Sequence, residues 1–408
     1  MVTRREATLL GLAAIASMPA TRAAAAAVGA SKVSTDPNDF LRYVDPELRG
    51  FLRTIPPETP ATAAQVRQWR SNPDAGAEAL PAGVVARTIP GPPGAPEVRI
   101  FIAGSSDGGR LRPAILYTHG GGYISGSTAS SWPKFSGLQK IAHDHDCLIV
   151  SVDYRLAPET PFPGALEDSY AALKWLHANA ASLGADPKRI AIMGESAGGG
   201  LAATLTIAAR DRGEVPVIFQ LLIYPMLDDR TGSTKEPASQ AGRFIWSRQS
   251  NRFGWSSMLG VPAGSSNVPR GAVPARVADL RGLPPTYIGV GSVDLFVDED
   301  IEYARRLVDA GVATELYLAP GAYHGFFFLA PDAAVSKQFT ASYNAALARA
   351  LAAAWSSTAR TTSPKAKGRG SLPIAAICRR RRWTATISCQ NGVAQGRPLK
   401  PISSTMTG

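Results

Sequence analysis

The amino-acid sequence predicts an α/β fold with a mostly parallel central sheet, helices on both faces and a helical cap. First, short apolar runs at 98–103, 114–118 and 147–153 alternate with helical or turn segments, as in sheets built from strand–helix units. Second, the apolar run 189–193 passes through a glycine-flanked serine into the Ala/Leu-rich run 201–210, which predicts a strand, a tight turn and a helix. Third, about fifty residues before Pro285 lack strand alternation, which indicates a functional insertion.

Residues 1–30 predict a cleaved export signal. Arg4 and Arg5 precede an apolar run at 7–18, and small residues follow it. The run is too short to span a bilayer, which needs about 20 apolar residues. The paired arginines favour the twin-arginine route. We therefore expect an exported protein, periplasmic or secreted; the alternative is a disordered Ala-rich terminus.

The catalytic domain is expected at 36–356, with a cap made of residues 36–83 and 226–283. The first cap segment is helical and interrupted by prolines, with a short helix starting at Asp45. The second is rich in aromatic residues at 244–246 and 252–259, and both stretches are expected to be helical. Further strands are expected at 217–224, 287–291 and 314–318, and helices at 301–310 and 333–355.

Ser196 is the candidate nucleophile. It stands at the apex of the predicted strand-to-helix turn, in Gly194-Glu-Ser-Ala-Gly198. Glycines two positions either side of it permit a strained turn that projects the hydroxyl above the sheet. A small-residue turn without chemistry is the simpler alternative for this motif taken alone.

A serine needs a base, and the base needs an acid partner. His324 is the only histidine after Ser196, and in hydrolases of this kind the chain order is serine, acid, histidine. Asp294 follows the expected strand 287–291 and is preferred as the acid. Asp298 is the weaker candidate, because at the start of the next helix it fits an N-terminal cap.

Backbone amides for the oxyanion are expected from two places. Gly120, Gly121 and Gly122 follow the strand 114–118 and expose N–H groups without side chains in the way. Ala197, directly after the nucleophile, supplies another amide. Taken alone, a glycine triplet would indicate only a flexible loop.

The last part of the chain, 357–408, has a different composition. It contains ten cations and no Asp or Glu, so residues 1–356 carry only +1 of the net charge of +11. This composition predicts a basic disordered tail, and contact with anionic lipid or nucleic acid is the less favoured reading of it. Cys378 and Cys389 lie in the tail and could pair after export, whereas Cys147 fits a buried strand. No metal-ligand spacing, phosphate loop or nucleic-acid motif is present, so no metal or cofactor and no nucleic-acid partner is expected.

The chain resembles the hormone-sensitive-lipase-like family of α/β-hydrolases, which includes bacterial esterases and acetyl hydrolases. The resemblance covers about residues 36–356 and lies in four segments, His119-Gly-Gly-Gly-Tyr123, Asp153-Tyr-Arg-Leu-Ala-Pro-Glu159 with its following Pro161-Phe-Pro163 and Glu167-Asp168, Gly194-Glu-Ser-Ala-Gly-Gly199 and His324-Gly-Phe326. Two positions depart from the family pattern: Glu195 stands where Asp is more frequent, and Leu295 where Pro is usual. Neither departure removes a catalytic group.

These features predict a serine carboxylic-ester hydrolase that forms an acyl-enzyme on small-molecule esters, without a cofactor or membrane insertion. Tyr123 and Phe326 are expected to bind substrate, and bulky rings near the nucleophile favour short acyl groups. Arg155, Glu159, Glu167 and Asp168 are expected to fix a loop rather than take part in chemistry. An amide or lactone hydrolase with the same triad and a non-catalytic binding protein on this fold remain alternatives, and the oligomeric state is open.

Overall fold

The computed structural model of the chain describes residues 37–53, 61–70, 80, 82–104, 109–127 and 137–352. The predicted export signal and basic tail lie outside these ranges. The described residues belong to one unit of the chain, residues 1–356.

One eight-stranded sheet carries the fold, with strand order β1-β2-β4-β3-β5-β6-β7-β8. Only the β1–β2 and β2–β4 pairs are antiparallel, so the predicted, mostly parallel sheet is confirmed. The strands are β1 (Val84–Ile89), β2 (Val98–Ala103), β3 (Arg112–Thr118), β4 (Leu148–Asp153), β5 (Ala185–Glu195), β6 (Phe219–Ile223), β7 (Thr286–Gly291) and β8 (Thr314–Ala319).

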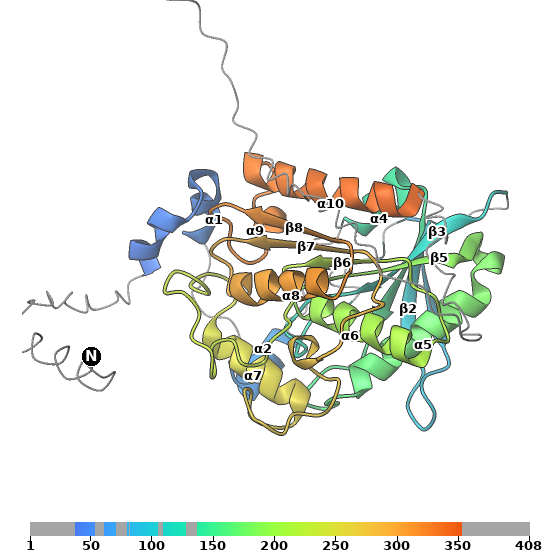
Figure 1. Cartoon of the computed structure of the whole chain (residues 1–408), viewed down its shortest axis with the longest axis horizontal. Coiled ribbons are helices and arrows are strands. Elements are labelled where there is room, and N and C mark those ends of the chain that lie inside the picture. The colour runs from blue at the N-terminus through green and yellow to red at the C-terminus, as the bar shows by residue number, and fades with distance from the viewer. Residues whose placement is uncertain are drawn as a thin grey trace, which may run out of the picture. The chain divides into compact units, whose positions relative to one another are not determined.

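Helices connect the strands and cover both faces of the sheet (Figure 1). They are α1 (Arg49–Leu52), α2 (Ala63–Arg70), α4 (Leu138–Asp144), α5 (Gly164–Asn179), α6 (Ala197–Arg212), α7 (Arg248–Leu259), α8 (Val297–Asp309), α9 (Phe326–Leu329) and α10 (Ala334–Ala352). Short 3-10 helices are η1 (Pro37–Tyr43), η2 (Pro46–Leu48), η4 (Ala181–Leu183) and η5 (Pro274–Arg276). Within the described ranges, none of the helices has the length and apolarity required to cross a membrane.

The sheet separates two apolar cores. In β3, Ala114 and Leu116 pack in the core that includes α5, α6 and α8, whereas Ile115 and Tyr117 pack in the core that includes α4 and α10. Figure 1 shows α10 and α4 on one side of the strands and α5, α6 and α8 on the other. This alternation follows from the two-residue period of a strand, and it explains why the central strands are apolar on both faces.

Three details differ from the sequence-based expectation. β1 was not expected, because four consecutive positions of Val84–Ile89 are exposed and its sequence lacks an apolar run. The stretch 244–246 is not helical; α7 begins after Ser247, whose Oγ accepts a hydrogen bond from the Ser250 amide. Asp298 is exposed in the otherwise buried first turn of α8, but the N-cap position is Phe296, and the helix begins at Val297, four residues before the predicted start at 301.

The first expected cap segment contacts the loop after β8 and shares an apolar core with the second segment. The Asp45 amide donates to the Gly321 carbonyl (3.0 Å), and the Tyr323 hydroxyl donates to the Leu48 carbonyl (3.3 Å), so η2 lies against the loop after β8. As expected, Asp45 caps this short helix, accepting from the Glu47 amide. Val66 of α2 belongs to the same apolar core as Trp255 of α7.

Candidate active site

Ser196 stands in a strained turn between β5 and α6. Its backbone has φ 55° and ψ −125°, an unusual conformation for a residue with a side chain. A Cβ at Gly198 would lie 2.1 Å from the Thr118 carbonyl oxygen, and one at Gly194 would lie 2.2 Å from the Gly198 carbonyl oxygen. Only glycine therefore fits at either position, which explains why a glycine stands two residues before and two residues after Ser196.

A continuous hydrogen-bonded chain joins the three predicted triad residues. His324 Nε2 lies 2.9 Å from Ser196 Oγ, and His324 Nδ1 lies 2.9 Å from Asp294 Oδ2. With hydrogen on Nδ1, the ring donates to the carboxylate and accepts from the serine hydroxyl. This geometry is competent for transfer of the serine proton to the imidazole.

The acid and the histidine are held by the loops after β7 and β8. Asp294 is fully buried, and its second oxygen accepts the Phe296 amide (3.0 Å). The His324 ring packs on the rings of Tyr224 (4.5 Å between centroids) and Phe296 (5.3 Å). These contacts restrict the ring to the orientation that reaches Ser196.

The glycine loop lies directly beside the nucleophile. A Cβ at Gly120 would be 3.4 Å from the Ser196 Cβ, and Gly121 and Gly122 have φ of 124° and 63°. The Gly121 carbonyl accepts the amides of Ile124 (3.1 Å) and Ser125 (2.9 Å), which fixes the turn. Within the described part of the chain, the amides of Gly121, Gly122 and Ala197 have no acceptor, so they are free to bind a developing oxyanion.

His119 and Tyr154 hold the glycine loop in place through hydrogen bonds and ring stacking. His119 Nδ1 lies 2.8 Å from the Gly120 carbonyl oxygen, and the Tyr154 hydroxyl donates to the His119 carbonyl (2.6 Å). The two rings stack with centroids 4.2 Å apart. Burial lowers the pKa of His119, so the ring is neutral and donates from Nδ1 to the loop.

Glu195, the residue before the nucleophile, is buried under the same loop. Its Oε1 accepts the Tyr117 hydroxyl at 2.5 Å. Burial raises the pKa of Glu195 to about 7, although the Tyr117 hydroxyl and the Gly120 amide both favour the ionised form. This carboxyl group does not contact the triad through any hydrogen bond found among the described residues.

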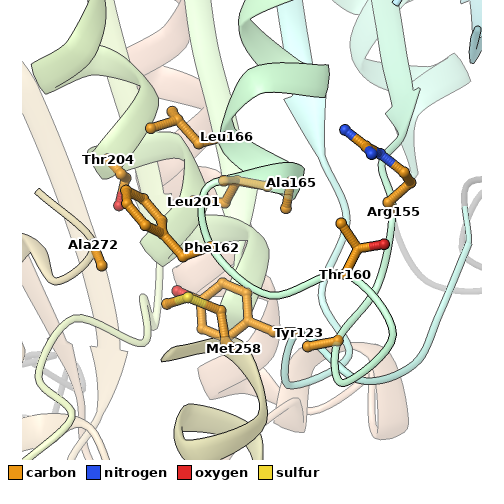
Figure 2. Close-up of a pocket in the computed structure, with 11 residues that line it drawn as sticks. Tyr123, Arg155, Thr160, Phe162, Ala165, Leu166, Leu201, Thr204, Met258 and Ala272 are labelled. Atoms are coloured by element: carbon orange, nitrogen blue, oxygen red, sulfur yellow. The ribbon is translucent and has the colours of Figure 1, made fainter. Parts of the chain in front are cut away.

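The two residues expected to bind substrate have different environments. Tyr123 has a positive φ of 65° and lines a cavity of about 20 Å³, with room for about one water molecule (Figure 2). The other lining side chains come from the segment 155–162, from α5, α6 and α7, among them Leu201 and Met258, and from Ala272. Phe326 is fully buried and packs on the Phe339 ring of α10 (5.0 Å), so it presents no surface to a substrate. We therefore place Phe326 in the core behind His324 rather than in the pocket.

The predicted loop-fixing residues do form ion pairs. Arg155 makes a bidentate pair with the buried Asp168 (2.7 and 2.8 Å), and Glu167 pairs with Arg212. Glu159 pairs with Arg70 of α2 (2.9 Å), a residue that sequence reasoning missed.

Arg70 connects two loops of the site. Its Nε donates to the Ile124 carbonyl (2.8 Å), just after the glycine loop, and its Nη2 donates to the Ala157 carbonyl (2.7 Å). An arginine in a helix separated from these loops by more than fifty residues carries no local sequence signal of this role. The role of Arg70 becomes visible only in the structure, where it pairs with Glu159.

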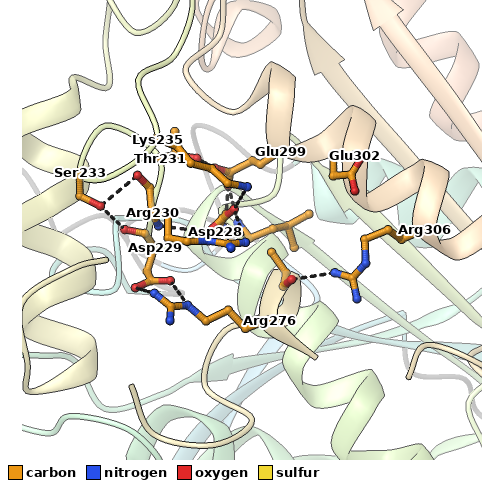
Figure 3. A network of polar contacts seen from close by, with 12 residues as sticks. Asp228, Asp229, Arg230, Thr231, Ser233, Lys235, Arg276, Glu299, Glu302 and Arg306 are labelled. Carbon is orange, nitrogen blue, oxygen red and sulfur yellow. Dashed lines mark hydrogen bonds and ion pairs between the residues drawn. The ribbon is translucent and has the colours of Figure 1, made fainter. Parts of the chain in front are cut away.

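A network of charged side chains fixes the loop after β6 (Figure 3). Buried Asp228 is paired with Arg230 and Lys235 (both 2.7 Å), and buried Asp229 with Arg276 (2.7 Å). Glu299 of α8 accepts the amides of the residues at 227 and 228, and burial raises its pKa well above the ordinary range. Among the described residues no group of His, Cys, Asp or Glu side chains is arranged to hold a metal ion.

The fold and this site define the chain as an α/β-hydrolase: the family model described as alpha/beta hydrolase fold matches residues 115–328. Carboxylesterase NlhH of Mycobacterium tuberculosis is 34% identical over 337 residues, which cover 78% of this chain and 99% of that protein. Ethyl acetate hydrolase of Pseudomonas putida is 32% identical over 233 residues, 56% of this chain and 70% of that protein. The solved structure of a bacterial heroin esterase superposes with a TM-score of 0.68 at 38% identity, covering 76% of this chain and 99% of the other.

The chain belongs to the hormone-sensitive-lipase-like family of α/β-hydrolases, as its four sequence segments indicated. It is a carboxylesterase-type hydrolase.

Proposed function

We propose that this protein hydrolyses short-acyl carboxylic esters through an acyl-enzyme on Ser196. The observation that carries the proposal is the chain from Ser196 through His324 to Asp294, placed beside three free backbone amides. These are the parts that acyl transfer by a serine requires: a nucleophile, a base, an orienting acid and oxyanion donors.

In the acylation step, Ser196 Oγ attacks the ester carbonyl carbon while its proton moves to His324 Nε2. The carbonyl oxygen becomes an oxyanion that the amides of Gly121, Gly122 and Ala197 stabilise. Collapse of this intermediate breaks the bond to the alcohol oxygen, which takes the proton from His324. Water then repeats the sequence on the acyl-enzyme and releases the acid. Asp294 keeps the hydrogen on Nδ1 and stabilises the imidazolium.

The preference for short acyl groups is supported by the rings that surround the site. Trp246 packs on Gly122, and Tyr224 and Phe296 flank the histidine. The cavity that Tyr123 lines, which no triad residue borders, holds only about 20 Å³, so it offers no room for a long acyl chain unless packed side chains move. The name of the Pseudomonas putida relative, ethyl acetate hydrolase, also supports a small acyl group.

Two measurements on the purified protein test the proposal. Ser196→Ala should lower kcat for p-nitrophenyl acetate by several orders of magnitude and abolish labelling by a fluorophosphonate probe, because triad residues act as a unit. Retention of near-normal turnover by this variant would refute the assignment of the nucleophile.

The acyl-chain preference is measured separately as kcat/KM across p-nitrophenyl esters. Acetate to hexanoate should turn over much faster than palmitate, without activation by an oil interface. A maximum at long chains would disprove the short-pocket argument and leave the triad assignment intact.

A further inference from the structure

Trp246, from the segment before α7, lies directly against the glycine loop. A Cβ at Gly122 would lie only 2.2 Å from Trp246 Cη2, so the indole covers the α-carbon of that glycine. Trp246 is itself buried, and the contact involves the six-membered part of its ring. Side-chain-free Gly122 is therefore needed for this packing as well as for its positive φ.

A strained backbone turn places the indole there. The Trp246 amide donates to the Phe244 carbonyl (2.8 Å), which closes a γ-turn around Ile245, and Ile245 has φ 65°. A β-branched residue at positive φ is a rare outlier, and such strain persists only where the surroundings over-determine it. The strained turn at Ile245 therefore places Trp246 in contact with Gly122 of the oxyanion loop.

Helix α7 confines Gly122 from a second direction. A Cβ at Gly254 of α7 would lie 2.6 Å from the Gly122 carbonyl oxygen. The helix backbone therefore approaches the loop at van der Waals distance. The Gly122 peptide is held between the indole of Trp246 and this helix.

The indole is tied to the acid side of the site by buried hydrogen bonds. Trp246 Nε1 donates to Asn251 Oδ1 (3.2 Å), and Asn251 Nδ2 donates to the Thr231 carbonyl (2.9 Å). The Thr231 hydroxyl donates to Glu299 of α8. Helix α8 begins three residues after Asp294, whose carboxylate accepts an amide of the intervening turn.

We propose that Trp246 is a positioning residue for the oxyanion loop. The hydrogen-bonded chain Trp246–Asn251–Thr231–Glu299 then fixes the position of this loop relative to the acid, Asp294. The inference rests on the proposed function, because it assigns a role to the loop that binds the oxyanion. Displacement of Gly122 by a fraction of an ångström moves one amide relative to the oxyanion, and removal of one such donor costs about 10²–10³ in kcat.

The test compares two inhibitors that differ in oxyanion formation. Trifluoroacetophenone bonds through its carbonyl carbon to Ser196 Oγ, the serine proton passes to His324, and the carbonyl oxygen becomes an oxyanion in the loop. Acetophenone binds without forming that adduct. The ratio of their inhibition constants therefore reports how well the loop stabilises the oxyanion and is insensitive to a general change in binding.

Trp246→Phe should reduce this ratio about tenfold and lower kcat for p-nitrophenyl acetate with little change in KM. Asn251→Leu, which breaks the next link, should act in the same direction, and the double variant should be no worse than the single Trp246→Phe. Trp175→Phe is the matched control: this indole lies on α5 over Arg87 of β1, and the ratio should not change.

A ratio that stays within twofold of the wild-type value in both Trp246→Phe and Asn251→Leu would overturn the inference. If Trp246→Phe does not fold, the Asn251→Leu ratio decides alone. Failure of the proposed function is a separate result, because it would appear as retained turnover in Ser196→Ala whatever the ratio does.

Discussion

Replacement of Glu195 by glutamine should change the pH dependence of stability in a defined direction. Burial raises the pKa of this carboxyl from 4.5 to about 7 in the folded protein. The folded protein therefore keeps the Glu195 proton in a range of pH where the unfolded chain has lost it. The stability contributed by this proton is fully present below pH 4.5 and is lost as the pH rises to about 7.

The size of the effect follows from the same pKa values. One pKa unit corresponds to about 1.4 kcal/mol, so the rise from 4.5 to about 7 corresponds to roughly 3–4 kcal/mol. Glutamine carries no proton that titrates in this range. Any cost of facing the Tyr117 hydroxyl and the Gly120 amide with an amide group is independent of pH and cancels in the comparison.

The assay is urea unfolding of wild type and Glu195→Gln at about pH 4.5 and pH 8, followed by tryptophan fluorescence. On going from the lower to the higher pH, the variant should gain about 3 kcal/mol relative to wild type. Glu302→Gln is the control: Arg305 lowers the pKa of this surface carboxyl, so any shift should be small and of opposite sign. Parallel pH profiles for wild type and Glu195→Gln would refute the burial argument.

Three further predictions concern the turn, the loops and export. Gly198→Ala forces a Cβ to within 2.1 Å of the Thr118 carbonyl oxygen; it should lower the free energy of unfolding by about 1–3 kcal/mol and reduce kcat, as measured by urea unfolding and esterase assay. Arg70→Lys replaces the planar fork, whose Nε and Nη2 reach two separate loops, by a single ammonium nitrogen, so it should cost about 2 kcal/mol in the same unfolding assay, and a change below about 0.5 kcal/mol would contradict the bridging role. We propose that residues 1–30 direct export by the twin-arginine route; replacement of both Arg4 and Arg5 by lysine should then retain the precursor inside the cell in a fractionation experiment, and unchanged export would favour the general route.

Much of the fold and the geometry of the triad could be predicted because each depends on local pattern. The strand–turn–helix around Ser196 needs glycine at two fixed positions, and the sequence shows both. His324 followed by elimination, since no other histidine comes after the serine. The structure places His324 within hydrogen-bond distance of both Ser196 and Asp294, as the sequence led us to expect.

What could not be predicted depends on contacts between distant segments. β1 lacks an apolar run because it lies at the sheet edge and is largely exposed, so its pairing with β2 decides its conformation. The expected helix at 244–246 was wrong because packing of Trp246 on Gly122 imposes an irregular turn on aromatic residues. Phe326 follows the histidine closely in sequence, yet the direction of its side chain is set by Phe339, which no short motif reveals.

The position of β8 has a consequence for heat inactivation. Among the strands that the structure describes, β8 pairs with β7 alone and lies at the edge of the sheet, and its Leu316 and Leu318 are 38% and 44% exposed. Edge elements with few buried contacts open at lower free energy than the core of a domain. The loop that carries His324 follows this strand, whereas Ser196 follows the central strand β5. On gradual warming, hydrolysis should therefore be lost while the helical circular-dichroism signal is still native. The edge strand β8 opens first and displaces His324, whereas Ser196 keeps its position after β5.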